Sequence, residues 1–261
     1  MFSMRSVRCG RCMQKISINL LMTCVVSAYY KIPSKKPHDW YMPHLVRWFR
    51  SVGTSSNVHF FTTDDVKSEI STQVSTDNVS FHILPFASFV ALSLGRDFWD
   101  RQFMRDPERY HSPELGMIWF EKQWFVDRAM QIDPSSVFVW CDAGCVRDDQ
   151  TEQVAKLFGR RGVSMDDGKI HLQQVAHLGN MRFYKYPDTA IAGAIMIGNR
   201  AAWKRFNAHY MRSLHAYDAA GIPAISDQYV IARCVHHHPT DYVLHAPAVS
   251  ISNWFSFLEM F

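Results

Sequence analysis

Two carboxylates stand where predicted strands end. The apolar run Val137–Cys141 has the length and composition of a buried strand, and it leads into Asp142-Ala143-Gly144. Val58–Thr62 is a second such run, followed by Thr63 and Asp64. Open α/β sheets bind ligands beyond the carboxyl ends of their strands, so both aspartates are predicted to lie where a ligand binds. The simpler alternative is that Asp142 caps a turn and Asp64 caps the next helix.

A lysine falls on the apolar side of a predicted helix. Ser112 and Pro113 are a typical N-cap and first helical residue, and the pattern continues to about Gln131. Lys122 shares its stripe with Leu115 and Phe125, and burying its charge is costly unless the charge is paired or reaches solvent. Either Lys122 extends to the helix margin, or it turns inward to a ligand phosphate or a carboxylate. Glu114, two turns earlier, is its predicted companion.

Later segments supply further polar groups. Gly193 lies in the small and β-branched run Thr189–Gly198, which indicates that a ligand or another backbone approaches closely there. Asp227 follows Ser226 at the predicted start of a helix. Cys9 and Cys12 form a C-x-x-C pair, but there is no second pair to complete a zinc site.

The elements that must position these residues alternate between strand and helix. At 261 residues, 48% of them hydrophobic, the chain has ample material for one core. We predict a three-layer Rossmann-like α/β domain with a mainly parallel sheet over residues 16–261, after a loose basic leader over residues 1–15. The polar stretch 160–180 is predicted to be a surface excursion. The predicted strands are Leu20–Ala28, Val58–Thr62, Phe81–Leu84, Val137–Cys141, Thr189–Gly198 and Tyr242–His245, and the predicted helices are Tyr41–Val52, Asp97–Met104, 113–131, Thr151–Phe158, Arg200–Ala219 and Tyr229–Val235.

Charge and cysteine content restrict the class of protein. A formal charge of +4 suits an anionic small molecule, and the chain carries no nucleic-acid-binding signature, so no nucleic-acid partner is expected. The chain has six cysteines, and those outside the C-x-x-C pair are spread out, which is typical of reduced thiols in a cytoplasmic protein. The apolar run Ile16–Ala28, at about 13 residues, is too short to span a membrane. Peripheral membrane contact through the basic leader stays open.

Several blocks resemble the HtrL/YibB-like family, which looks like nucleotide-sugar-dependent glycosyltransferases of the GT-A kind. The two specific blocks are HSPELGMIWFEKQWFVDRA at 111–129 and VFVWCDAGCVRD at 137–148; the others are VVSAYYKI at 25–32, FFTTDD at 60–65, IAGAIMIG at 191–198 and SDQY at 226–229. The resemblance implies a GT-A-like domain with the sugar nucleotide over the C-terminal edge of the sheet. It also implies transfer of a hexosyl or pentosyl group to a hydroxyl of a glycan, glycoprotein, glycolipid or lipid-linked acceptor, as in polysaccharide biosynthesis.

The resemblance also implies roles for individual residues. Asp227 would deprotonate the acceptor hydroxyl. Residues implied to contact the donor are Tyr29 and Tyr30 at the nucleobase, Asp64 near the base or ribose, Lys122 with its companion Glu114 near ribose or phosphate, Arg147 at the phosphates, and Gly193 beside the sugar or acceptor.

A divalent cation, Mn²⁺ or Mg²⁺, is implied as well. The family's Asp-x-Asp motif aligns with Asp142-Ala143-Gly144, so Gly144 replaces the second acid. One carboxylate holds such a cation only with help from phosphate and water. Arg147 could instead neutralise phosphate directly. His245 is either a further metal ligand or an ordinary structural histidine.

The residues and the resemblance together leave three alternative functions. The first is a glycosyltransferase that uses Asp142, Asp227 and Lys122. The second is a non-catalytic relative that binds a carbohydrate or a nucleotide on the same fold, and the third is a metal-dependent hydrolase or nucleotidyltransferase. Convergence of Asp64 with these three residues in one cleft would favour an enzyme, whereas pairing of Asp142 with Arg147 would favour a binding role.

Overall fold

The computed structural model describes residues 23–55, 57–108, 110–156, 167–176, 190–246, 255 and 257. The predicted leader and much of the polar stretch 160–180 lie outside the described residues. None of the described helices is long and apolar enough to cross a bilayer.

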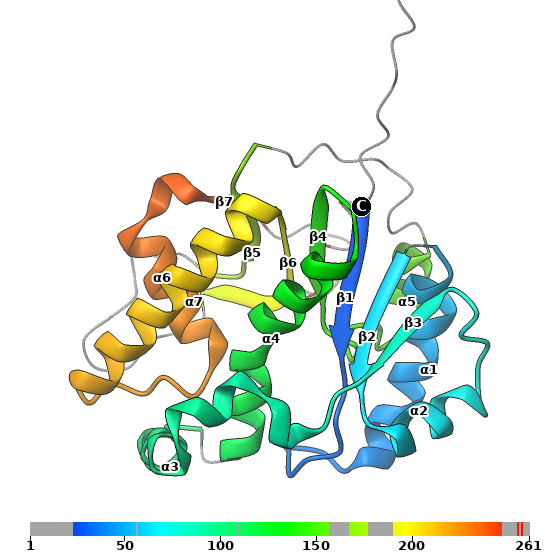
Figure 1. The fold of residues 1–261 in the computed structure, drawn as a ribbon, viewed down its shortest axis with the longest axis horizontal. Coiled ribbons are helices and arrows are strands. Elements are labelled where there is room, and N and C mark those ends of the chain that lie inside the picture. The colour runs from blue at the N-terminus through cyan, green and yellow to red at the C-terminus, as the bar shows by residue number, and fades with distance from the viewer. Residues whose placement is uncertain are drawn as a thin grey trace, which may run out of the picture.

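The described strands form one mixed sheet of seven (Figure 1), in the order β3-β2-β1-β4-β6-β5-β7. Neighbouring strands are parallel except at β6, which is antiparallel to both β4 and β5. The prediction of a mainly parallel sheet is therefore confirmed. The strands are β1 Thr23–Ala28, β2 Asn57–Thr62, β3 Val79–Ile83, β4 Val137–Cys141, β5 Ile170–Gln174, β6 Ile191–Asn199 and β7 Tyr242–His245.

Helices cover both faces of this sheet and complete the three layers (Figure 1). Side chains alternate along β1, so Val25 packs into one core with α1, α2 and α5, while Cys24 and Val26 pack into the other with α4, α6 and α7. The helices are α1 His38–Ser55, α2 Asp64–Ser71, α3 Arg96–Arg105, α4 Pro113–Ile132, α5 Asp149–Ala155, α6 Arg200–Ala219 and α7 Asp227–His237, with short 3₁₀ turns η1 Phe86–Ser88, η2 Val90–Leu94 and η4 Pro239–Asp241.

Helix α4 begins where the sequence predicts. The Ser112 hydroxyl accepts a hydrogen bond from the backbone N–H of Leu115 at 3.1 Å, and Pro113 takes the first helical position. The same hydroxyl donates to the carbonyl of Pro33 at 2.7 Å. This cap therefore fixes both the start of α4 and the loop that follows β1.

The strand order reverses between β1 and β4. From β1 the chain proceeds outward through β2 and β3, and it then returns to add β4 on the other side of β1. Such a switch point leaves a crevice at the carboxyl ends of the two strands, which is where open α/β sheets bind ligands. A hydrogen bond of 2.6 Å from the Ser27 hydroxyl to the carbonyl of Cys141 ties the two strand ends together.

Two features differ from the sequence prediction. The stretch 160–180 is not a surface excursion throughout, because it contains the buried strand β5. The residues of this strand, IHLQQ, look polar, but His171 and Gln173 are buried and paired: Gln173 accepts a hydrogen bond from the backbone of Phe257 at 3.0 Å. The second feature is the direction of β6, which periodicity alone does not predict.

Candidate active site

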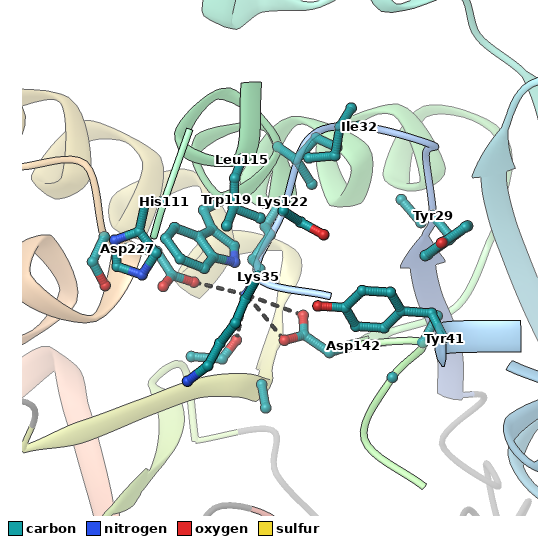
Figure 2. Close-up of a pocket in the computed structure, with 18 of the residues that line it drawn as sticks. Tyr29, Ile32, Lys35, Tyr41, His111, Leu115, Trp119, Lys122, Asp142 and Asp227 are labelled. Atoms are coloured by element: carbon teal, nitrogen blue, oxygen red, sulfur yellow. Dashed lines mark hydrogen bonds and ion pairs between the residues drawn. The ribbon is translucent and has the colours of Figure 1, made fainter. Parts of the chain in front are cut away.

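A cavity of about 440 Å³ opens at the carboxyl ends of β1 and β4, at the switch point of the sheet (Figure 2). This volume lies in the range of small-molecule sites. Its lining comes from the ends of β1 and β4, the loop after β1, helix α4, the middle of β6 and the start of α7. Segments that are distant in sequence thus meet at one site.

Lys122 lines this cavity and connects three of its elements. Its Nζ atom donates to Asp227 Oδ2 at 2.7 Å and to the carbonyl of Gly193 at 3.0 Å, and it lies 3.0 Å from Asp142 Oδ1. Only 4% of its side chain is exposed. Of the two alternatives for this lysine, the inward orientation is therefore the one that the structure contains (Figure 2).

The two carboxylates keep Lys122 charged. Burial alone would lower its pKa, but Asp142 and Asp227 outweigh that effect and raise the pKa above the ordinary lysine value. The ammonium is consequently a fixed positive charge on a nearly unexposed side chain. Electrostatic interactions with a ligand are stronger in such a site than in bulk water.

Asp142 is held by hydrogen bonds to two strands, β4 and β6. Trp140, two residues earlier on the same face of β4, donates from Nε1 to Asp142 Oδ1 at 2.7 Å. The backbone N–H of Asp142 donates to the carbonyl of Ala194 at 2.7 Å. One third of the Asp142 side chain, 33%, is nevertheless exposed toward the cavity. Its ion-pair partner is Lys122, whereas Arg147 donates to the carbonyl of Gly144 at 3.1 Å.

Gly193 makes room for a carboxylate. A Cβ atom at this position would lie 2.5 Å from Asp227 Oδ2, closer than real contacts allow. The close approach predicted from the sequence is thus made by the side chain of Asp227, which is only 5% exposed, and not by another backbone. Gly193 and Asp227 form one packed unit against Lys122.

Aromatic and basic side chains form the walls. Tyr29 and Tyr41 stand at one side, with ring centroids 6.1 Å apart, and the Tyr29 hydroxyl pairs with His38 Nδ1 at 2.9 Å. Trp119 stands at the other side, edge-on to His111. Sequence reasoning missed several lining residues, namely Lys35, Tyr41, His111, Trp119 and Trp140. Spacing offered a signal for two of them, because Trp119 precedes Lys122 by one helical turn and Trp140 precedes Asp142 by two strand positions.

Three predicted site residues lie outside the lining of this cavity. Asp64 is exposed in the first turn of α2, one residue after the N-cap Thr63. Glu114 pairs with Arg96 Nη1 at 2.9 Å, so it is not the companion of Lys122. His245 contacts His171, with its Nε2 atom 2.9 Å from Nδ1 of that residue. Tyr30 does line the cavity, although it is mostly buried and its hydroxyl donates to the carbonyl of Leu84 at 3.1 Å.

The residues present do not fit a resident divalent cation at Asp142. Both of its carboxylate oxygens already accept hydrogen bonds, one from Trp140 and the other from Lys122 at 3.3 Å. Gly144 supplies no side-chain ligand. Within the described residues, Asp142 belongs to no group of three His, Cys, Asp or Glu ligand atoms. The Lys122 ammonium instead occupies the space between the two carboxylates.

Comparison with known proteins gives a family and two similar folds. Residues 94–261 match the sequence model of a family described as "Bacterial protein of unknown function (HtrL_YibB)". No curated protein sequence matches the chain. The crystal structure of mouse xyloside xylosyltransferase 1 in its apo form is similar, with a TM-score of 0.47 and 13% identity over 85% of this chain and 84% of that one. A glycosyltransferase involved in the glycosylation of the major capsid of PBCV-1 is also similar, with a TM-score of 0.44 and 11% identity over 87% of this chain and 82% of that one.

Proposed function

The chain belongs to the HtrL_YibB family, as its sequence blocks predict, and from that premise we propose that it is a glycosyltransferase. The donor is a nucleotide sugar, and the acceptor is a hydroxyl of a glycan, a glycoprotein or a lipid-linked sugar. The observation that carries this proposal is the buried Lys122 ammonium, fixed by two carboxylates at the switch point of the sheet. A fixed cation at this position suits the diphosphate of a nucleotide sugar.

The walls of the cavity suit the rest of the donor. Tyr29 and Tyr41 offer aromatic surface beside the end of β1, where a nucleobase would lie. Lys35 and Arg147 add positive charge to the same lining, so three basic side chains can face the phosphates. These basic groups balance the three acidic side chains of the lining, Glu108, Asp142 and Asp227.

The proposed reaction needs two actions from the protein. The acceptor oxygen forms a bond to the anomeric carbon, and the bond from that carbon to the diphosphate breaks. Lys122 stabilises the negative charge that develops on the leaving diphosphate oxygen. Asp227, which lines the same cavity, takes the proton of the acceptor hydroxyl. Asp142 positions Lys122 and presents its exposed side to the sugar.

Calorimetric titration tests the donor. The wild-type protein would be titrated with UDP-, GDP- and dTDP-sugars, with and without Mn²⁺. We expect one donor to bind in the absence of Mn²⁺ and Lys122→Met to weaken its binding by at least about tenfold, because the substitution leaves the negative charges of Asp142 and Asp227 uncompensated beside the diphosphate. Lys156→Met is the matched control, since Lys156 is a lysine outside the cavity that pairs with Glu152.

Two further measurements separate the alternatives. Because Lys122→Met leaves the buried carboxylate of Asp227 and the half-buried one of Asp142 without a counter-charge, circular dichroism must show that this variant is folded; Asp142→Asn is the second, milder variant. Release of nucleoside diphosphate in the presence of glycan acceptors would support transfer. Donor binding without release across an acceptor panel would favour the non-catalytic alternative. If no donor binds with or without Mn²⁺, the proposal is wrong.

A further inference from the structure

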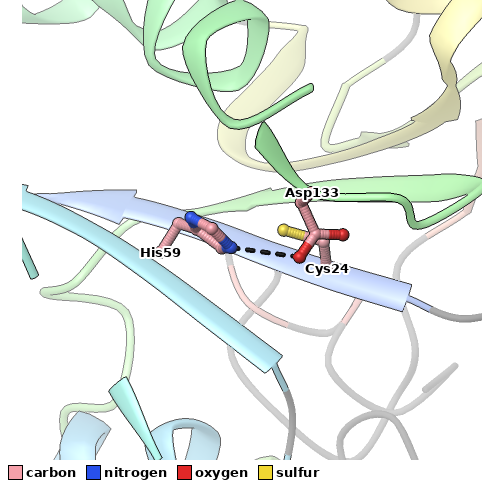
Figure 3. A group of neighbouring side chains, drawn as sticks. All are labelled: Cys24, His59 and Asp133. Carbon is pink, nitrogen blue, oxygen red and sulfur yellow. Dashed lines mark hydrogen bonds and ion pairs between the residues drawn. The ribbon is translucent and has the colours of Figure 1, made fainter. Parts of the chain in front are cut away.

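A second group of polar side chains lies at the amino ends of the parallel strands β1 and β2, opposite the end at which the cavity opens. It consists of Cys24, His59 and Asp133, all buried (Figure 3). Cys24 stands near the start of β1, His59 near the start of β2, and Asp133 immediately after α4. The cavity described above lies at the carboxyl ends of these strands, so this group and the residues around Lys122 lie at opposite ends of the strands.

We propose that Cys24, His59 and Asp133 bind a zinc ion. Their Sγ, ring-nitrogen and carboxylate-oxygen atoms all lie within 4.8 Å of one another. Sulfur, imidazole nitrogen and carboxylate oxygen together are a donor set that zinc accepts. A thiolate, a carboxylate and a neutral imidazole carry two negative charges, which balance Zn²⁺ and make its burial tolerable. Binding releases the thiol proton to solvent as the Zn–S bond forms.

The geometry of His59 fits this role. Its Nε2 atom lies 3.1 Å from Asp133 Oδ2. Two ligands that each lie about 2.0–2.1 Å from one tetrahedral zinc are separated by about 3.3 Å. The other ring nitrogen, Nδ1, pairs with His82 Nε2 at 2.8 Å. Histidines that bind metals commonly have such an outer partner, which fixes the ring orientation and the tautomer.

Asp133 is also oriented by neighbours. Its Oδ1 atom accepts the backbone N–H of Ser135 at 2.8 Å, and the side chain of Asn57 donates to its Oδ2 atom. Arg200 is close, but its guanidinium donates to main-chain carbonyls, including that of Asp133, and not to the carboxylate. Asn57 is exposed, so the cluster lies next to the surface and an ion has a short path to it.

Cys24 is the ligand that needs a partner. In the part of the chain that the structure describes, its thiol makes one long hydrogen bond, 3.9 Å to the carbonyl of Val25. The His59–Asp133 ion pair alone therefore leaves the sulfur without a strong interaction. A zinc ion would satisfy all three side chains and join β1, β2 and the α4–β4 connection.

Metal analysis of the full chain tests the site. Protein stripped with a chelator would be incubated with Zn²⁺, dialysed and analysed by inductively coupled plasma mass spectrometry. We expect one zinc per wild-type chain and its loss in Cys24→Ser. Cys234→Ser is the matched control, because Cys234 is also buried but bonds to Ser213 on another element. The double variant Cys9→Ser/Cys12→Ser should also keep the zinc, which excludes the C-x-x-C pair as its source.

Cobalt gives an independent readout. Co²⁺ in the site should produce a thiolate-to-cobalt charge-transfer absorption in the wild type that is absent from Cys24→Ser. If Cys24→Ser does not fold, Asp133→Asn takes its place in the test. This variant preserves the shape of the side chain, and it should weaken zinc binding at least tenfold. The proposal is wrong if folded wild-type protein binds no stoichiometric zinc, or if Cys24→Ser retains both the zinc and the cobalt absorption.

Discussion

Two glycines line the same cavity but differ in what surrounds them. A Cβ atom on Gly193 would lie 2.5 Å from Asp227 Oδ2, whereas a Cβ atom on Gly144 would meet only Tyr41, at 3.9 Å. We therefore expect Gly193→Ala to displace Asp227 from Lys122 and to destabilise the protein by about 1–3 kcal/mol, the usual cost of overpacking a core. Urea unfolding measures the stability, and donor titration measures the effect on the site.

Gly144→Ala is the control for that substitution. It adds the same methyl group to the same cavity. Because no atom lies closer to that methyl group than Tyr41 at 3.9 Å, the free energy of unfolding should stay within about 0.5 kcal/mol of the wild type. Equal effects of the two variants would contradict the assignment of Gly193 as the residue that admits Asp227. The comparison of the two variants also separates the steric effect on Asp227 from any effect that a methyl group has elsewhere in the cavity lining.

Some of the site could be predicted residue by residue. Asp142 was predictable because a buried strand runs directly into it, and Lys122 because it interrupts an apolar stripe. The partners of Lys122 were not predictable, since they lie 20 and 105 residues away in sequence. Glu114, a neighbour at helical spacing, was the wrong partner. Local spacing identifies a residue that needs a counter-charge, but the tertiary fold decides which counter-charge it receives.

At the scale of elements, the cap of α4 links helix stability to the site. The Ser112 hydroxyl accepts from Leu115 and donates to Pro33, in the loop that carries Lys35. We expect Ser112→Ala to cost about 1 kcal/mol of folding free energy, the typical contribution of an N-cap. Donor affinity should fall by less than in Lys122→Met, because the loop loosens while the ammonium stays in place.

Chemical denaturation and donor titration of Ser112→Ala test this expectation. Ser75→Ala is a suitable control, since Ser75 is a surface serine whose hydroxyl donates to a near neighbour in sequence, Asp77. An unchanged unfolding free energy in Ser112→Ala would contradict the cap's role.

The elements also show which patterns can be read from sequence. Apolar runs predicted β1, β2, β4 and β6, and capping residues predicted α4 and α7. Strand β5 was missed because its buried polar residues obtain partners from distant segments: His171 pairs with His245, and Gln173 pairs with the backbone of Phe257. Without those partners in view, a buried polar strand and a surface loop have the same composition.

For the whole molecule, His209 predicts how stability depends on pH. Burial, together with the positive potential of His238, Arg212 and Arg205, lowers its pKa to about 4, against the weaker opposite effect of Asp241. The unfolded chain takes up a proton below about pH 6.5, while the folded protein resists protonation until about pH 4. Stability should therefore fall as the pH drops through this window.

Urea unfolding at pH 7 and pH 5 measures that fall. His209→Gln removes the titrating group, so it should lose about 2 kcal/mol less than the wild type between these two values. The measured group is well defined structurally, since its ring stacks on His238 and its Nδ1 atom pairs with the Tyr242 hydroxyl at 3.0 Å. Parallel losses in both proteins would assign the pH dependence to other groups.

The three anchors of Lys122 have a consequence for how the protein is made. They come from residues 142, 193 and 227, so a ribosome must synthesise more than a hundred further residues after the lysine before its charge is fully paired. Until α7 emerges and docks, the nascent chain cannot bury this ammonium without a large cost, and its hydrophobic surfaces stay exposed for that interval. The last anchor to be translated thus completes the pairing of Lys122, and chains that stop short of it should be substrates for chaperones and proteases.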